Sequence, residues 1–531
     1  MMKKLVLGLL IATAIVVPTQ NLKAQAFGTD VTVEANPSNQ QPKAMDIALN
    51  GWIYVLNSMD TGGYNISRST DGGNTFTVIG DVTTSTVYNH VDLIVAGSNT
   101  DTSQFSLFIA GYNPDNKVIY IDNYDRDGNF ISSPYSKSIP NTTLGVRGLE
   151  LATDYKSPGE NGTVSPFSVV LATTERNGVN DSLRYFYSSS AGTSFVEVPV
   201  YGTSRFLERV SIAHGKSANY NNGRYFIAFE DFSASAAPSG HIGYTFTAND
   251  VTGGFLPVMW IDTVASVTGG QINNNVNNPR ISFSSTTVDN DSSEFTGVVL
   301  FDRQFSVGDR DVLAFCNKRP MGTSITGWFR SDINNDGNVN CFDGDISYDP
   351  LFNNFLVTLY DSTHHDLNFT VKGFNLATPG NWSAFYIYNY CDNNANLVAP
   401  TPRVVMNNVT QKVGWAWTEK ISGKLVTKFD AEWRGSAPNA VVENTMVNSL
   451  NVFPNPADAE VNIYFDLKQA GKVSFRLYDA LGQQVSTIYD GQAGAGQNAV
   501  NLNVQNLASG MYLYTLQTDK GALSGKLTVK H

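Results

Sequence analysis

Cysteine is scarce in this sequence. Three cysteines in 531 residues, Cys316, Cys341 and Cys391, exclude a small disulfide framework, because at most one bridge can form within the chain. Which pair would form it does not follow from the sequence. No CxxC pattern and no Cys/His spacing of a zinc site is present.

Positive charge is also in short supply. Charged residues make up 15% of the chain, and the formal net charge is -12. Nothing resembles the basic footprint of a nucleic-acid-binding protein, so we expect no nucleic-acid partner. A polar but weakly charged composition, rich in Asn, Ser, Thr and Gly, is typical of secreted all-β proteins.

Long hydrophobic runs are absent beyond the N-terminus. Two lysines precede the apolar run Leu5–Val17, and small residues follow at Ala24–Ala26, which predicts a signal peptide over residues 1–26. The apolar run is short for a membrane span, and no later run approaches such a length. We therefore expect no transmembrane segment in the mature chain.

Helical periodicity is nearly absent as well, and short β-rich runs separated by Gly, Asn and Asp dominate. A short apolar strand with a polar residue at its middle, followed by a longer β-rich strand, recurs seven times. These units begin at Ala44, His90, Gly148, Arg209, Arg280, Asp345 and Arg403. Further strands follow each unit, as expected for a seven-bladed β-propeller over residues 27–434. Six or eight blades stay open, because blade boundaries read from sequence are imprecise.

The last unit shows a third strand, Lys424–Trp433, but no clear fourth. The β-rich segment Asp30–Ala35 precedes the first unit. We expect this N-terminal strand to complete the last blade and to close the ring.

One turn, Ser69–Phe76, sets the register of the repeat. Its two glycines suit the positive φ of a tight hairpin, Asp71 can bond the N–H groups of the turn, and the Phe76 ring can pack between units. It lies between the third and fourth strands of the first unit, and a degenerate copy, Ser188–Phe195, holds the same place in the third. The pattern resembles the Asp box of sialidases and other β-propeller proteins.

This resemblance implies either a sialidase-type enzyme or a bladed scaffold without that chemistry. Sialidases hold a carboxylate with three arginines, the first of them in a Phe/Tyr-Arg-Ile-Pro motif early in the propeller. No arginine precedes Arg68 here, and the motif is absent. Seven blades also differ from the sialidase count of six, so we expect no sialidase activity and assign no catalytic residue.

The first residues of the repeated units include three arginines and a histidine. In a propeller these positions ring one mouth of the central channel. His90, Arg209, Arg280 and Arg403 therefore predict a site for an anionic ligand, because guanidinium groups pair carboxylate or phosphate bidentately. The alternative is that they are hydrated polar caps, partly paired with Asp345 and nearby acids.

A second cluster has the spacing of a calcium loop. Position 6 is a glycine, where such a loop turns sharply. The oxygen donors at positions 1, 3, 5, 7, 9 and 12 are Asp332, Asn334, Asp336, Asn338, Asn340 and Asp343. The loop resembles those of dockerins and EF-hands, although position 12 is Asp and the flanks have strand character. We expect a structural Ca²⁺ that stiffens a loop between blades; a turn that needs no metal is the alternative.

The C-terminal part has its own character. A Ser/Pro/Asn-rich linker, residues 435–449, precedes alternating strands that predict a small β-sandwich over residues 450–531. Its motifs resemble the C-terminal sorting domain of the type IX secretion system of Bacteroidetes. They are Asn451–Pro456, Tyr478–Gln483, Leu507–Leu513 and Gly525–Lys530. The resemblance implies that residues 450–531 bind the secretion machinery, and that the protein is secreted or attached to the outer-membrane surface.

Together these features predict a secreted or surface-displayed module that binds a glycan, peptide or protein. An extracellular polysaccharide-degrading propeller, either a glycoside hydrolase or a lyase, is the alternative and would need convergent carboxylates. A structural role in adhesion or in a surface layer is a third interpretation.

Overall fold

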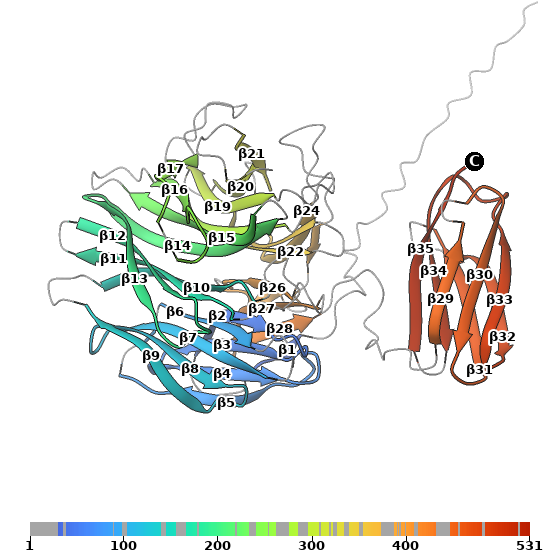
Figure 1. Ribbon diagram of the computed structural model, residues 1–531, viewed down its shortest axis with the longest axis horizontal. Helices are drawn as coiled ribbons and strands as arrows, with labels where there is room; N and C mark the ends of the chain where they lie inside the picture. The colour runs from blue at the N-terminus through green and yellow to red at the C-terminus, as the bar shows by residue number, and fades with distance from the viewer. Residues whose placement is uncertain are drawn as a thin grey trace, which may run out of the picture. The chain divides into compact units, whose positions relative to one another are not determined.

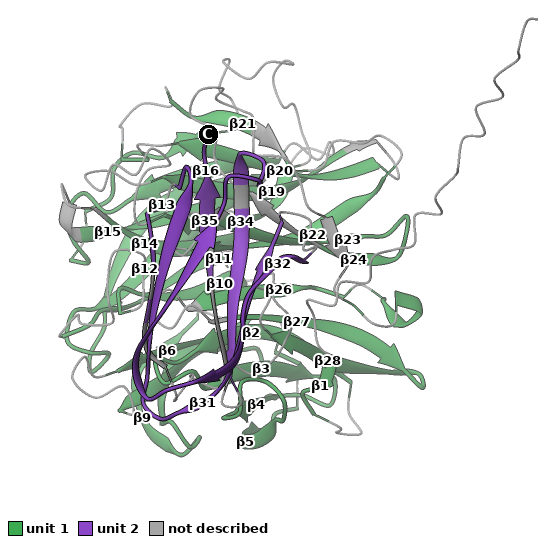
Figure 2. Cartoon of the chain, turned by 90° about the vertical axis from the view of Figure 1, so that its right-hand side faces the viewer, with its two compact units in different colours: residues 1–436 green, residues 437–531 purple. Residues whose placement is uncertain are grey.

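The computed structural model divides into two compact units, residues 1–436 and 437–531 (Figure 2). The structure describes residues 30–431 and 447–531 except 35–38, 86, 89, 98–103, 140–144, 156–165, 178–179, 218–219, 233–239, 253, 262–275, 285–295, 307–308, 318–319, 322–326, 334–338, 350–353, 373–386, 390, 392–393, 399, 408–411, 455–456, 480–483 and 519–520. The predicted signal peptide and most of the predicted linker lie outside the described residues.

The first unit contains seven four-stranded antiparallel sheets, in agreement with the seven predicted blades (Figure 1). Blade one consists of β2 (Gln40–Ile47), β3 (Ile53–Met59), β4 (Tyr64–Ser69) and β5 (Thr77–Val82), and blade two of β6 (Val91–Gly97), β7 (Phe105–Asn113), β8 (Val118–Asp125) and β9 (Phe130–Ser138). Blade three consists of β10 (Gly145–Thr153), β11 (Val169–Asn177), β12 (Asn180–Ser188) and β13 (Val196–Thr203). Blade four consists of β14 (Phe206–Ser217), β15 (Tyr220–Phe232), β16 (Gly240–Phe246) and β17 (Met259–Trp260). Blade five consists of β18 (Val276–Phe283), β19 (Gly297–Ser306), β20 (Asp309–Asn317) and β21 (Phe329–Asp332). Blade six consists of β22 (Cys341–Asp349), β23 (Asn354–Asp361), β24 (Asp366–Lys372) and β25 (Ile387–Asn389). Blade seven consists of β26 (Arg403–Asn407), β27 (Lys412–Ile421) and β28 (Lys424–Ala431), together with β1 (Val31–Thr32). A short 3-10 helix, η2, spans Asn394–Asn396.

The blades form a closed ring. The first strand of each blade contacts that of the next in the order β2, β6, β10, β14, β18, β22 and β26, and β26 contacts β2 again. The N-terminal strand β1 pairs with β28, where Val31 lies opposite Phe429. This confirms that the N-terminal strand supplies the fourth strand of the last blade.

Apolar side chains between neighbouring blades form the core of the ring. Phe226 of blade four, for example, packs on Phe283 of blade five with 4.3 Å between ring centroids. The Ser69–Phe76 turn of blade one takes part in this packing, because the Phe76 ring lies 5.0 Å from that of Phe429 in blade seven. Within the turn, the Asp71 carboxylate accepts the Thr75 N–H at 3.0 Å. The turn is therefore a structural contact between blades.

The second unit is a β-sandwich. One sheet has the order β29 (Val447–Phe453), β30 (Glu460–Leu467), β33 (Gly496–Asn503), and the other β32 (Gln484–Ala493), β31 (Gly471–Tyr478), β34 (Gly510–Thr518), β35 (Gly521–Val529). Apolar residues of both sheets, such as Phe465 and Phe475, share one buried core. The fold is therefore all-β, with a propeller and a small sandwich as predicted.

Candidate functional site

The first strands of all seven blades line a cavity of about 600 Å³ in the middle of the ring. We call it the channel cavity. The four residues predicted to bind an anion, His90, Arg209, Arg280 and Arg403, all line it. The first strands of the blades therefore bring together residues that lie more than 300 positions apart in the sequence.

Two further cations, Lys43 and Arg147, line the same cavity and were missed in the sequence. Each is the extra residue of a β-bulge: Lys43 between two paired residues of β2, and Arg147 between two paired residues of β10. A bulge adds one residue to the strand and interrupts the alternation of side chains between the two faces of the sheet, so it can direct a side chain toward the cavity. The only signal in the sequence was a cation one position before the aligned start of a repeat.

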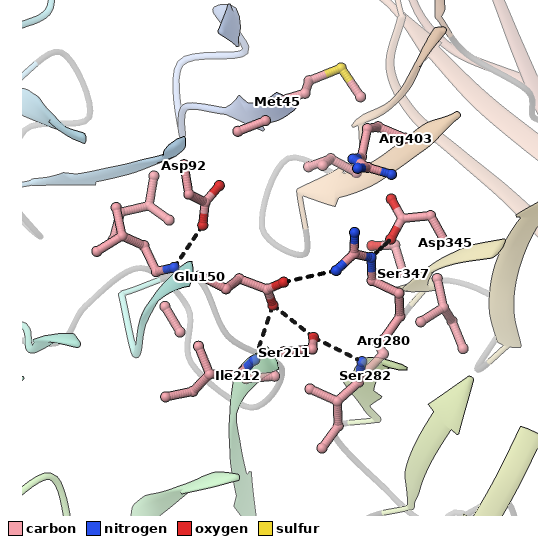
Figure 3. Close-up of a pocket in the computed structure, with 18 of the residues that line it drawn as sticks. Met45, Asp92, Glu150, Ser211, Ile212, Arg280, Ser282, Asp345, Ser347 and Arg403 are labelled. Carbon is pink, nitrogen blue, oxygen red and sulfur yellow. Dashed lines mark hydrogen bonds and ion pairs between the residues drawn. The ribbon is translucent and has the colours of Figure 1, made fainter. Parts of the chain in front are cut away.

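Arg280 is neutralised within the protein. Its Nη1 lies 3.2 Å from Glu150 Oε2 and its Nε lies 3.5 Å from Asp345 Oδ1, so the guanidinium bridges carboxylates of blades three and six. Figure 3 shows Glu150 and Asp345 on either side of it. For Arg280 the predicted alternative, a polar cap paired with Asp345, describes the contacts better than a vacant anion site.

The remaining cations have no carboxylate within ion-pair distance among the described residues. Arg403 donates to the backbone carbonyls of Lys43 and Pro402, at 3.5 and 3.0 Å. The Lys43 ammonium donates to the amide oxygen of Gln41 at 3.4 Å. Arg209 is exposed, and the buried Nε of Arg147 has no hydrogen-bond partner in the described ranges. We call Lys43, Arg147, Arg209 and Arg403 the cation set.

The protonation of two cavity residues reflects this accumulation of positive charge. Burial and the charge of Arg403 lower the pKa of Lys43 to about 8. Burial, with the charges of Lys43, Arg147 and Arg209, lowers the pKa of His90 to about 4. His90 is therefore neutral near pH 7 and contributes a hydrogen-bonding ring, while the positive charge comes from the cation set.

The polar residues at the middle of the first strands tie neighbouring blades together. Asp46 Oδ2 accepts the Val95 N–H at 2.6 Å, and Asp92 Oδ2 accepts the Leu151 N–H at 2.6 Å. Glu150 Oε1 accepts the N–H of Ile212 at 3.0 Å. In each case a side chain of one blade satisfies a backbone donor at the edge of the next sheet. This recurring bond explains the polar residue in the repeat.

Two of these carboxyl groups have raised pKa values. Burial and the charge of Glu150 raise the pKa of Asp92 to about 7. Burial also raises the pKa of Glu150, although 24% of its side chain stays exposed. With Asp46, Asp343 and Asp345 they make five carboxyl groups beside five Lys and Arg side chains in the lining. Among the described residues, Arg280 is the one of these five cations that lies within ion-pair distance of a carboxylate.

β14, β18 and β22 contain bulges as well, and deeply buried carboxylates accept backbone N–H groups within them. Glu230, 2% exposed, accepts the backbone N–H groups of Arg209 at 3.1 Å and Asn278 at 2.7 Å. Asp302, which is fully buried, accepts that of Asp343 at 3.0 Å. Asn278 and Asp343 both have a φ of 56°, an uncommon conformation that these bonds stabilise.

The predicted calcium loop is described only in part. Asn334, Asp336 and Asn338 lie outside the described residues, as does the side chain of Asp332. Asn340 Oδ1 accepts the Arg310 N–H at 3.0 Å, and Asn340 Nδ2 donates to Ser362 at 2.7 Å. Asp343 lies in β22 and lines the channel cavity.

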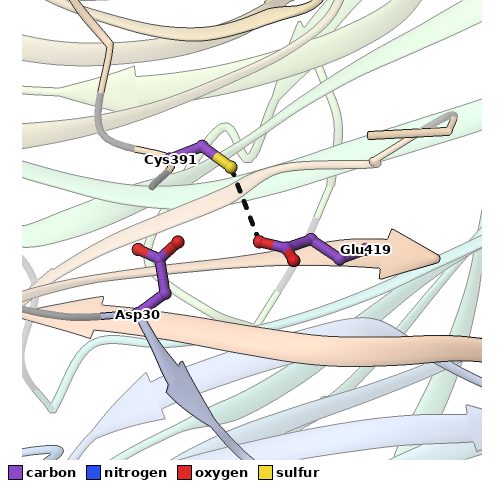
Figure 4. A group of neighbouring side chains, drawn as sticks. All are labelled: Asp30, Cys391 and Glu419. Atoms are coloured by element: carbon purple, nitrogen blue, oxygen red, sulfur yellow. Dashed lines mark hydrogen bonds between the residues drawn. The ribbon is translucent and has the colours of Figure 1, made fainter. Parts of the chain in front are cut away.

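Another group of potential metal ligands lies where the ring closes (Figure 4). The ligand atoms of Asp30, Cys391 and Glu419 all lie within 4.8 Å of one another. Glu419 already accepts hydrogen bonds from Cys391 Sγ at 3.5 Å and from Trp417 Nε1 at 3.2 Å. These bonds account for the carboxylate without a metal. None of Cys316, Cys341 and Cys391, all of which the structure describes, forms a disulfide bond, and all three are buried.

Comparison with known proteins identifies the C-terminal unit. Residues 451–530 match the secretion system C-terminal sorting domain family, which agrees with the sequence motifs. The protein is therefore a cargo of the type IX secretion machinery and is delivered to the cell surface or beyond it. No helix among the described residues is long and apolar enough to cross a membrane. No curated protein matches the chain.

Solved structures with a similar fold are distant in sequence. The α-L-arabinofuranosidase Arb93A from Fusarium graminearum, in complex with an iminosugar inhibitor, is 11% identical over 78% of this chain and 100% of that chain, with a TM-score of 0.45. The polysaccharide lyase Uly1 is 8% identical over 75% and 90%, with a TM-score of 0.44. The β-propeller domain of the trilobed protease from Pyrococcus furiosus is 9% identical over 75% and 96%, with a TM-score of 0.40. The fold they share does not assign an activity to this chain.

Proposed function

We propose that the protein is an extracellular binding module that captures an acidic glycan in its channel cavity. The observation that carries the proposal is the cation set: Lys43, Arg147, Arg209 and Arg403 line one cavity without a carboxylate partner among the described residues. Lys43, Arg147 and Arg403 are half-buried. Cations that are partly removed from water and left unpaired are unfavourable, and an anionic ligand would offset that cost. Guanidinium groups suit carboxylate and sulfate groups, which they can bind bidentately.

The size of the site favours a small or chain-like ligand over a folded protein. A concave cavity of about 600 Å³ is typical of sites for small ligands, whereas protein interfaces bury broad surfaces. Delivery to the cell surface brings the cavity into contact with extracellular polysaccharides. An acidic glycan meets both conditions.

Calorimetric titration with galacturonic acid oligomers and with sulfated oligosaccharides tests the proposal. Replacing Arg209 or Arg403 by Ala should weaken binding by about tenfold or more, because a hydrogen bond to a charged group contributes ~1.5–3 kcal/mol. The Lys420→Ala variant removes the same charge from an exposed position of β27 outside the cavity, and should bind as the unmodified protein does. If neither class of acidic oligomer binds, or if the arginine variants bind unchanged, the proposal fails.

A polysaccharide-degrading enzyme is the second candidate, and the raised pKa values of Asp92 and Glu150 favour it. A carboxyl group that stays protonated toward neutral pH suits a general acid. However, Asp92 Oδ2 and Glu150 Oε1 both accept backbone N–H groups of the next blade, and Glu150 Oε2 pairs with Arg280. The carboxylates therefore have structural roles already. Release of shorter products from an acidic polysaccharide, abolished by Glu150→Gln, would decide for the enzyme.

We also propose a structural Ca²⁺ in the loop 332–343. Six oxygen donors at calcium-loop spacing support it, and Asn340 anchors the end of the loop to Arg310 and Ser362. Removing calcium with EDTA should lower the melting temperature. The Asp336→Ala variant should melt at the lower temperature with or without EDTA. A melting temperature that EDTA leaves unchanged in the unmodified protein would contradict the calcium site.

A further inference from the structure

A second hollow adjoins the channel cavity. It has a volume of about 530 Å³, and three of its residues, His90, Arg147 and Arg209, also line the channel cavity. Two cations and a neutral imidazole therefore lie at the boundary that the two spaces share. We call the second space the side hollow.

The side hollow differs in chemistry from the channel cavity. Phe206, which is half-buried, supplies an apolar surface, and the Arg176 guanidinium lies 4.1 Å from the centre of its ring. Arg176 is held in place by Asp181 at 3.2 Å and Glu208 at 3.1 Å, so it adds no unpaired charge. The side hollow thus combines an apolar wall with three arginines and the carboxyl groups of Glu208 and Glu230.

Two buried polar atoms in its lining have no hydrogen-bond partner in the part of the chain that the structure describes. They are Asn277 Oδ1 and Arg147 Nε, an acceptor and a donor. Buried polar groups are normally hydrogen-bonded, and leaving one without a partner destabilises the protein. Sugar hydroxyl groups both donate and accept, so a sugar ring could satisfy an acceptor and a donor while its C–H groups contact Phe206.

We infer that the two hollows are consecutive subsites for one acidic oligosaccharide. An acidic sugar occupies the channel cavity against Arg403 and Lys43, the chain passes Arg147 and Arg209, and the next sugar units fill the side hollow. The inference rests on the proposed function and makes it more specific: the ligand is a chain of several acidic sugars and not a single small anion.

Linked subsites make affinity depend on chain length. A ligand that reaches both hollows gains the second set of contacts without paying again for association, so affinity rises by more than the added contacts of one unit alone. Titration with galacturonic acid, its dimer and its tetramer should show the tetramer binding at least about tenfold more tightly than the monomer.

Two variants separate the subsites. Asn277→Ala should weaken tetramer binding more than monomer binding, because Asn277 lines only the side hollow. Arg403→Ala should weaken both to a similar degree, because Arg403 lines only the channel cavity. Phe206→Leu keeps an apolar side chain and provides a second side-hollow variant, and the melting temperature of each variant is measured to check that it folds.

The outcomes distinguish the inference from the proposed function. A monomer that binds as tightly as the tetramer, or an Asn277→Ala variant that loses affinity equally for both, would overturn the paired subsites and leave the acidic-glycan site intact. If no acidic sugar of any length binds, both fall. Sulfated tetramers that bind where uronic acid tetramers do not would keep the two subsites and assign sulfate groups to the cation set.

Discussion

Lys43 connects the pH of the medium to the charge of the channel cavity. Its pKa is lowered to about 8, so its ammonium begins to lose its proton just above neutral pH. Because the positive charge of the cation set is what attracts the ligand, we expect affinity for an acidic oligosaccharide to fall as the pH rises through about 8. Titrations at a series of pH values measure this fall.

The Lys43→Met variant isolates this effect. It should bind more weakly below about pH 8 and lose less affinity above it, because it has no ammonium to titrate. Asp92, with a pKa raised to about 7, gains negative charge over a lower pH range, and Asp92→Asn removes that contribution. If Lys43→Met shows the same steep fall above pH 8 as the unmodified protein, another group controls the affinity.

Asp302 links stability to pH in the opposite sense from a typical surface carboxylate. Burial, with the charge of Asp343, raises its pKa to about 7, above the value of about 3.9 in an unfolded chain. The folded state then holds the proton more tightly, so the stability that this group contributes is complete below about pH 4 and is lost as the pH rises through about 7.

The Asp302→Asn variant keeps the shape of the side chain but cannot ionise. Its free energy of unfolding should fall less than that of the unmodified protein between about pH 5 and 8, by an amount on the order of a few kcal/mol. Urea unfolding at several pH values gives the comparison. Parallel pH curves for the two proteins would show that Asp302 does not titrate in this range.

At the scale of the strand, hydrogen bonds between neighbouring blades are made by the polar residue in the middle of a blade's first strand. Ser211, 1% exposed, accepts the Ile281 N–H at 3.2 Å and donates to Glu150 at 2.7 Å. Ser282 holds the same position in the next blade, and its hydroxyl makes no hydrogen bond to the described residues. The pair offers a matched test of the bond.

We expect Ser211→Ala to lower the free energy of unfolding by about 1–3 kcal/mol, because a buried backbone donor loses its acceptor. Ser282→Ala removes an equal volume and should cost clearly less. Chemical denaturation of both variants measures the difference. Equal losses would mean that the cost arises from packing and not from the bond between blades.

The same strands explain what could be predicted and what could not. The alternation of apolar residues around one polar position is local, so the seven first strands and the positions of Arg209, Arg280 and Arg403 were visible in the sequence. The bulges at Lys43 and Arg147 were not, because a bulge depends on pairing with the neighbouring strand. The pairing of Arg280 was hidden for the same reason: Glu150 lies 130 residues earlier.

At the scale of the whole molecule, ring closure is the least local feature, yet a short sequence motif predicted it. Blade seven lacked a fourth strand, and the β-rich segment before blade one was the available substitute. In the structure, β1 pairs with β28, and Val33, 2% exposed, enters a core cluster with Phe429. The ends of the propeller chain thus stabilise each other across nearly 400 residues.

This arrangement makes the two ends of the chain unequal. Deleting residues 30–34 removes the strand that closes the ring and exposes the core residues that Val33 covers, such as Phe429. Because burying one apolar side chain such as Val33 contributes about 1.5–3 kcal/mol, we expect the melting temperature of the propeller to fall sharply. Deleting residues 437–531 removes a far longer segment, but that segment is a separate compact unit with its own core. The propeller should then keep its melting temperature and its affinity for acidic oligosaccharides, as judged by calorimetry on both truncated proteins. An unchanged melting temperature after loss of the short N-terminal strand would contradict closure of the ring by β1. A lower melting temperature of the propeller after loss of the sandwich would contradict the independence of the two units.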